Sequence, residues 1–287
     1  MELATGWITY DTLAGDVAAY IARPEAAAAP LPGIIVLQEI WGVDRHIADL
    51  VERFASASYF VLAPDLFSAG GGRPPALAPE RVAAAQEFLN SIPQATWMAV
   101  LGDQARRAEA LAKLPGDEAR SVGETLGQLF GGGRDPGRSL VITHAAADYL
   151  RSHPACSGRL IGSVGYCMGG GLSAQLACTD PDLGAAVIYY GASPSADQVS
   201  SIRCPVRGFY GQNDPRVVAG LPDFQAALKA AGVDHELRVY PDTGHAFFND
   251  RRPSYQPESA RDAWARTLAF FADTLGPVPT APVQEAG

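Results

Sequence analysis

One short stretch of the sequence combines a possible nucleophile with a backbone that could expose it. In Gly165-Tyr166-Cys167-Met168-Gly169 a cysteine stands between two glycines, directly after Leu160–Val164, an apolar run that predicts a buried strand. This spacing is typical of a nucleophile elbow, where a strand turns sharply into a helix and the central side chain projects outward. The N–H groups at the start of that helix would face a developing anion. We therefore predict Cys167 as nucleophile and the Met168 N–H as an oxyanion donor.

Two further side chains could activate this thiol. Asp214 lies just past the strand predicted at Val206–Tyr210, and His245 lies just past the strand predicted at Leu237–Tyr240. In an open parallel sheet, ligands bind at the edge formed by the carboxyl ends of the strands. His245 could remove the thiol proton and later give one to a leaving group. Asp214 could hold the imidazole in the required tautomer and stabilise its charged form.

An acidic residue ends another predicted buried strand. Glu39 directly follows Gly33–Gln38, and a carboxylate at the end of an apolar strand costs desolvation unless a partner uses it. One interpretation is a simple capping or salt-bridging acid. The other places Glu39 beside Cys167, where it could accept the thiol proton, and on this interpretation Glu39 belongs to the site.

The elements that must position these residues alternate between strands and helices. Strands are predicted at Trp7–Tyr10, Val17–Ala22, Gly33–Gln38, Tyr59–Ala63, Leu160–Tyr166, Ala185–Tyr190, Val206–Tyr210 and Leu237–Tyr240, and helices at Ile47–Ala57, Ser139–Arg151, Gly169–Ala177, Leu221–Ala231 and Ser259–Leu275. Alternation of this kind indicates an α/β protein with a mostly parallel sheet covered by helices on both faces. The first two strands, around a turn at Leu13–Asp16, predict a hairpin. We expect residues 1–275 to form one domain and residues 276–287 to be disordered.

Residues 80–135 interrupt the alternation. Helical pieces are predicted at Pro79–Asn90, Gln94–Leu114 and Glu118–Phe130, with no strand signal between them. Two interpretations stay open for this insertion. It could cap a site above the sheet, or it could be a surface excursion that packs on one edge.

Composition excludes several classes of protein. The chain has 287 residues, of which 47% are hydrophobic and 18% charged, which excludes a disordered protein. A net charge of −9 without a basic cluster argues against nucleic-acid binding.

We find no signal-peptide pattern and no apolar run long enough to span a membrane, so a cytoplasmic location is expected. Cys156, Cys178 and Cys204 are interpreted as buried reduced thiols, and the four cysteines show no metal-ligand spacing.

Taken together, the motifs resemble those of the dienelactone hydrolases (carboxymethylenebutenolidases) of the α/β-hydrolase superfamily. The matching pieces are Gln38-Glu39-Ile40-Trp41-Gly42-Val43, Ala63-Pro64-Asp65-Leu66, Gly165-Tyr166-Cys167-Met168-Gly169-Gly170, Tyr189-Tyr190-Gly191, Gly211-Gln212-Asn213-Asp214 and Gly244-His245-Ala246-Phe247. The order of nucleophile, acid and histidine is also that of the α/β-hydrolases. The resemblance implies an α/β-hydrolase fold and hydrolysis of a small-molecule ester or lactone through a thioester acyl-enzyme, without metal or organic cofactor.

The resemblance also implies roles for single residues. Cys167, His245 and Asp214 would form the triad, and Glu39 would hold the resting thiol protonated and help to ionise it when substrate enters. The backbone N–H groups of Ile40 and Met168 would form the oxyanion hole. Trp41 and Arg81 are candidates for substrate contacts.

The sequence departs from the family pattern at the arginines that bind a substrate carboxylate. One of them lies four residues after the histidine, where this chain has Asn249. Arg251 and Arg252 are near but out of register, and Arg73 or Arg81 could supply the other. An amide cannot replace a bidentate guanidinium, so the departure argues against dienelactone itself as substrate.

Other functions of the same fold stay open. The elbow would equally serve a thioesterase, a peptidase or a carbon–carbon bond hydrolase. A non-catalytic thiol sensor would keep Cys167 reactive without ester turnover.

Overall fold

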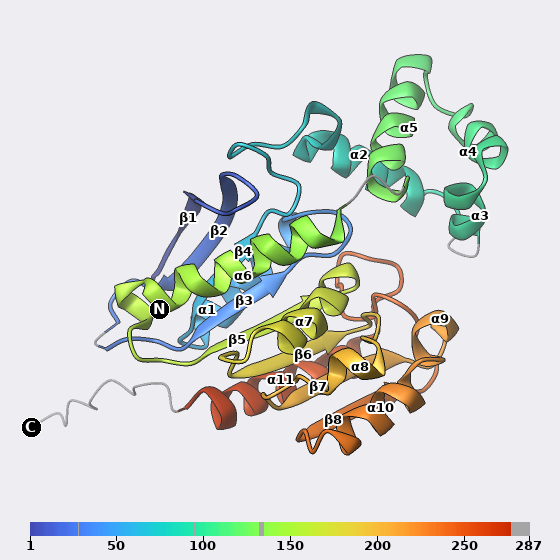
Figure 1. Ribbon diagram of the computed structural model, residues 1–287. Helices are drawn as coiled ribbons and strands as arrows, with labels where there is room; N and C mark the ends of the chain where they lie inside the picture. The colour runs from blue at the N-terminus through green and yellow to red at the C-terminus, as the bar shows by residue number, and fades with distance from the viewer. Residues whose placement is uncertain (28, 94–95, 132–134, 277–287) are drawn as a thin grey trace, which may run out of the picture.

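An eight-stranded sheet forms the centre of the computed structural model, which describes residues 1–27, 29–93, 96–131 and 135–276 (Figure 1). The expected disordered tail therefore lies almost entirely outside the described residues. The strands are β1 (Leu3–Tyr10), β2 (Val17–Pro24), β3 (Gly33–Leu37), β4 (Phe60–Pro64), β5 (Ile161–Tyr166), β6 (Ala185–Tyr189), β7 (Val206–Gly211) and β8 (His235–Tyr240). Their order in the sheet is β1-β2-β4-β3-β5-β6-β7-β8.

The pairing of the strands confirms the predicted hairpin and the mostly parallel sheet. The hairpin strand β2 pairs antiparallel with β1 and with β4. All other neighbours in the sheet, from β4 across to β8, run parallel. The carboxyl ends of β3, β5, β6, β7 and β8 therefore meet at one edge of the sheet.

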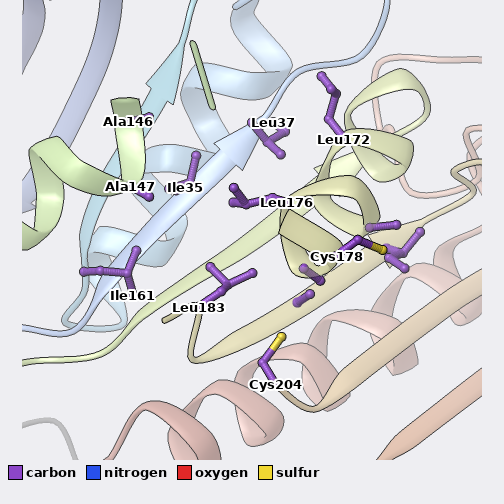
Figure 2. Close-up of a cluster of buried hydrophobic side chains, with 14 of the residues drawn as sticks. Ile35, Leu37, Ala146, Ala147, Ile161, Leu172, Leu176, Cys178, Leu183 and Cys204 are labelled. Carbon is purple, nitrogen blue, oxygen red and sulfur yellow. The ribbon is translucent and has the colours of Figure 1, made fainter. Parts of the chain in front are cut away.

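Helices cover both faces of this sheet, as the alternating pattern predicts. On one face lie α1 (Arg45–Ser56) and α11 (Pro257–Leu275), and on the other lie α6 (Pro136–Ser152), α7 (Met168–Thr179) and α10 (Leu221–Ala230). Ile34 and Val36 of β3 pack under the first pair, whereas Ile35 and Leu37 pack under α6 and α7 (Figure 2). Successive side chains of a strand point to opposite faces, which is why an apolar run without alternation marks a strand buried on both sides.

Two short helices that the sequence pattern did not predict follow strands of the sheet. They are α8 (Ala196–Val199) and α9 (Pro215–Val218). The second begins directly after Asp214 and so lies beside the site. Among the described residues, no helix has both the length and the apolar character needed to cross a bilayer.

The described part of residues 75–130, here called the helical segment, stands apart from the sheet (Figure 1). The segment contains the short 3₁₀ helix η1 (Pro75–Leu77) and the α-helices α2 (Pro79–Asn90), α3 (Trp97–Gly102), α4 (Gln104–Leu111) and α5 (Gly116–Phe130). It has a small core of its own, which includes Val82, Phe88 and Leu126. Trp41, which follows β3, packs into this core and joins the helical segment to the sheet edge.

The predicted helix over Gln94–Leu114 is wrong in its continuity. Its first two residues lie outside the described part of the chain, and the rest forms two helices, α3 and α4, separated at Asp103. The Asp103 carboxylate accepts hydrogen bonds from the N–H groups of Ala105 and Arg106, at 2.8 and 3.1 Å. Such a cap starts a new helix and gives it a new direction. α2 has the bounds that the sequence predicts.

The turn from β5 into α7 is packed against backbone on both sides. The Gly169 N–H donates to the carbonyl of Gln38 at 3.1 Å, so the start of α7 touches the end of β3. A Cβ atom on Gly169 would overlap the carbonyl groups of Leu37 and Gln38, and one on Gly165 would overlap the backbone of Gly169. These glycines are required because backbone occupies the space of a side chain.

Gly169→Ala therefore destabilises the protein, by about 1–3 kcal/mol or more, because the two backbone segments must separate. Gly171→Ala is the matched control in the same helix, since its Cβ would lie at ordinary contact distance, 3.7 Å, from Ala192. We expect that change to be neutral or to stabilise by about 0.5–1 kcal/mol. Chemical denaturation of both variants measures the difference. Equal unfolding free energies for the two variants would contradict the crowding at Gly169.

Candidate active site

Cys167 occupies a strained position between β5 and α7. Its backbone has φ 56° and ψ −114°, a conformation that residues with a side chain rarely adopt. The Cys167 N–H donates to the carbonyl of Tyr189 at 3.0 Å, and its own carbonyl accepts from Gly170 at 3.0 Å. These bonds fix the turn from both sides, and the side chain is partly exposed. The predicted elbow conformation is thus present.

Two backbone positions next to Cys167 have the location expected of oxyanion donors. Met168 begins α7, and its N–H belongs to the first turn, where N–H groups point out of the helix along its axis. Ile40 lies two residues beyond Gln38, whose carbonyl is bound to the start of the same helix. Ile40, Met168 and Cys167 all line one cavity.

His245 and Asp214 come together at the ends of neighbouring strands. The Nδ1 atom of His245 lies 2.5 Å from Oδ2 of Asp214, and the Asp214 side chain is almost completely buried. The loops that carry them are joined, since the Asn213 N–H donates to the Thr243 carbonyl at 2.8 Å. The Cys167 sulfur is close enough to the imidazole to raise its pKa, and both side chains line the same cavity. The structure therefore pairs His245 with Asp214 and brings both to the cavity that Cys167 lines.

Once the Cys167 sulfur carries a negative charge, the surroundings of His245 favour its charged form. Burial lowers the pKa of the imidazole, but the adjacent Cys167 sulfur and the Asp214 carboxylate both raise it, and together they outweigh burial. The pKa of His245 consequently lies above its ordinary value. An imidazolium held between sulfur and carboxylate is suited to stabilise a thiolate.

Glu39 is buried at the end of β3, and neutral donors hold both of its oxygens. Oε1 accepts from the Tyr190 hydroxyl at 3.1 Å, and Oε2 accepts from Nδ2 of Asn249 at 2.8 Å. The simple salt-bridge interpretation does not describe these contacts. Asn249, the residue at the position of the expected arginine, is instead a partner of the glutamate. Tyr190 was not predicted as a site residue, although its ring lies edge-on to His245 with centroids 5.1 Å apart.

Arg252 is a buried cation at the same edge. Its guanidinium carbon lies 4.6 Å from the ring centroid of Trp41, and Nη1 donates to Oδ1 of Asn90 at 3.1 Å. Among the described residues, Nη2 is buried without a hydrogen-bond partner. Burial lowers the pKa of Arg252, and the charge of Glu39 acts in the opposite direction. The stacking on Trp41 stabilises the charge without using its donors.

A cavity of about 640 Å³ connects these groups. Cys167, His245, Asp214, Glu39, Ile40 and Met168 contribute to its lining. The helical segment contributes Trp97 and Leu101 of α3 and Phe130 of α5 to the lining, and α9 contributes Pro215, Arg216 and Val217. Its volume is within the range of small-molecule sites.

The structure shows which of the candidate arginines reach the cavity. Arg252 lines the cavity, but Arg81 does not, because its guanidinium binds Glu124 at 2.8 Å and the Ser121 carbonyl within the helical segment. Arg73 binds the buried carboxylate of Asp65. The prediction of Arg81 as a substrate contact therefore has no geometric support. Trp41, the other predicted contact, lines the cavity.

One arginine that the sequence reasoning missed also lines the cavity. Arg216 lies on α9 and is exposed at its surface. The sequence signal for Arg216 was its position two residues after Asp214. Residues in the loop that follows a strand lie at the same edge of the sheet as that strand's end.

Comparison with known proteins agrees with this geometry. The Dienelactone hydrolase family profile matches residues 17–275. A Saccharolobus solfataricus protein named "Putative carboxymethylenebutenolidase" is 34% identical over 267 residues, covering 92% of this chain and 96% of that protein. A protein of the same name from Escherichia coli K12 is 30% identical over 280 residues, covering 94% and 87%.

Solved structures lead to the same family. The crystal structure of a "Putative Dienelactone Hydrolase" from Klebsiella pneumoniae has a TM-score of 0.71 and 29% identity, and the match covers 95% of this chain and 99% of that one. The similarity of fold thus accompanies the similarity of sequence. The chain belongs to the dienelactone hydrolase family of α/β-hydrolases.

Proposed function

We propose that this chain hydrolyses carboxyl esters or lactones with Cys167 as nucleophile, His245 as general acid–base and Asp214 as its orienting carboxylate. Membership of the family makes the chain a hydrolase of ester bonds, and the proposal adds the residues and the intermediate. The observation that supports it most is the hydrogen-bonded pair of His245 and Asp214, which lines the same cavity as Cys167. This cavity is large enough for a small ester.

The proposed reaction has two halves. His245 takes the proton of the Cys167 thiol, and the sulfur forms a bond to the ester carbonyl carbon. The carbonyl electron pair moves to oxygen, which the N–H groups of Ile40 and Met168 stabilise. When the pair returns, the carbon–oxygen bond to the alcohol breaks and His245 gives its proton to that oxygen. Water, deprotonated by His245, then cleaves the thioester, releasing the acid and restoring the thiol.

Glu39 is proposed to assist this cycle from its buried position. The hydroxyl of Tyr190 and the amide of Asn249 fix the direction of its carboxylate. Both partners are neutral, and the charge that acts on Glu39 from nearby is that of Arg252. From this position Glu39 faces the cavity that Cys167 and His245 also line.

Arg252 is proposed as the residue that attracts an anionic group of the substrate. It is buried in the cavity wall, and its Nη2 is unpaired among the described residues. A carboxylate or similar group on the substrate would satisfy this donor. The register of the family arginines differs, since Asn249 here binds Glu39.

Replacing the nucleophile tests the proposed function. Cys167→Ser lowers kcat on a chromogenic short-chain ester by about a hundredfold or more, because a hydroxyl is much harder to ionise than a thiol. His245→Ala loses about 10²- to 10⁴-fold. His144→Ala is the control, since this histidine binds Thr179 away from the cavity. Full turnover in Cys167→Ser or His245→Ala, or none in the wild type on a broad ester panel, defeats the proposal.

Truncating Arg252 tests its proposed role in binding an anionic group of the substrate. Arg252→Ala raises KM about tenfold or more for an ester with a free carboxylate, because a charge-assisted hydrogen bond contributes about 1.5–3 kcal/mol. The neutral methyl ester of the same compound shows a smaller change. Arg251→Ala is the matched control, because its side chain is exposed one residue away. A loss of equal size for both esters would show that Arg252 acts only through packing.

A further inference from the structure

We infer that the helical segment forms the binding wall for the acyl part of the substrate, and that Trp97, Leu101 and Phe130 favour bulky apolar acyl groups. This inference rests on the proposed ester hydrolysis and concerns its specificity. The three residues are partly exposed and line the cavity that holds Cys167. We refer to them below as the acyl wall.

The acyl wall is built so that its apolar surface faces the cavity. In α3, Trp97 and Leu101 are four residues apart and lie on one face of the helix. Val100, between them, is buried in the core of the helical segment. The indole Nε1–H of Trp97 donates to the carbonyl of Ile92 at 3.3 Å. Because this polar atom is bound within the segment, the ring can offer apolar area to a ligand.

The acyl wall is continuous with the oxyanion side of the site. The ring of Phe130 lies edge-on to that of Trp41, with centroids 5.8 Å apart. Trp41 directly follows Ile40, and Ile40 itself packs against the core of the helical segment. An acyl chain leaving a carbonyl held at Ile40 and Met168 therefore finds apolar surface next to it.

The opposite side of the cavity suits the leaving group. His245 must give a proton to the departing oxygen, so the alcohol has to lie against His245. The wall next to the His245–Asp214 pair is α9, with Pro215, Arg216 and Val217. Val217 packs against the core under α7 and α10, not against the core of the helical segment. The cavity thus has two walls of different origin, and the acyl chain is assigned to the helical segment.

Two series of esters test this assignment. The first keeps p-nitrophenol and lengthens the acyl group from acetyl to octanoyl, and the second keeps the acetyl group and enlarges the alcohol. We expect kcat/KM of the wild type to rise with acyl length, by up to about fourfold for each fully buried methylene. The measured quantity is the ratio of kcat/KM for octanoate to that for acetate.

Variants of the two walls should have different effects. Leu101→Ala and Trp97→Ala each lower the octanoate-to-acetate ratio about tenfold, whereas Trp97→Phe restores most of it. Val217→Ala is the matched control on the opposite wall, and it changes the alcohol series while leaving the octanoate-to-acetate ratio within about twofold. Thermal unfolding of each variant establishes that the fold is intact. The inference is overturned if the octanoate-to-acetate ratio is unchanged by Leu101→Ala and Trp97→Ala. It is also overturned if Val217→Ala lowers that ratio as much as they do.

A binding measurement separates this inference from the proposed function. Calorimetric titration of Cys167→Ala with octanoate, the product of the longest ester, needs no turnover. We expect binding that weakens about tenfold when Leu101→Ala is added and that stays nearly unchanged when Val217→Ala is added. Absent ester turnover in the wild type together with this binding pattern would defeat the proposed reaction alone. Octanoate binding that is insensitive to Leu101 would defeat the acyl wall alone.

Discussion

The close contact between backbone segments around Cys167 is the constraint on which the site depends. The start of α7 lies against the end of β3 at Gly169 and against Gly191, after β6, at Gly170. No side chain fits between these segments, so the elbow has little freedom to relax. The strained backbone of Cys167 is therefore held by its surroundings. Cys167, Met168 and Ile40 consequently line one cavity.

Much of this arrangement could be predicted because it is local or follows from topology. The elbow is a run of five residues, and its glycines mark the positions where neighbouring backbone leaves no room for a side chain. Asp214 and His245 are far apart in the chain, but each follows a strand, and parallel strands end at one edge. The apolar runs of β3 and β5 indicated strands buried on both faces.

The parts that could not be predicted depend on contacts within the helical segment and between this segment and the edge of the sheet. Arg81 seemed a reasonable substrate contact by position, yet it is bound to Glu124 within the segment. Arg252 reaches the cavity only because Trp41 and Asn90 hold it there, and these contacts cross large distances in the sequence. Asp103 is a residue type that often caps a helix, and this could have predicted the break. The helical pattern on both sides of it favoured one long helix instead. Tyr190 and Asn249 needed a structure, since nothing local links them to Glu39.

Trp41 connects these features. It follows Ile40, the proposed oxyanion donor, packs into the core of the helical segment, and stacks on the guanidinium of Arg252. The indole ring of Trp41 thus contacts both the residues at the sheet edge and the helices that line the cavity. Proteins with the same strand-end residues can differ in specificity through the helices packed above them.

Identifying the acylated residue during turnover tests the central claim most directly. The wild-type enzyme would be mixed with an excess of a p-nitrophenyl ester, quenched in acid within milliseconds, and mapped by mass spectrometry. The account predicts an acyl group on the peptide that contains Cys167, which hydroxylamine removes as expected for a thioester. An acyl group on another residue, or continued turnover of the same ester by Cys167→Ala, would contradict it.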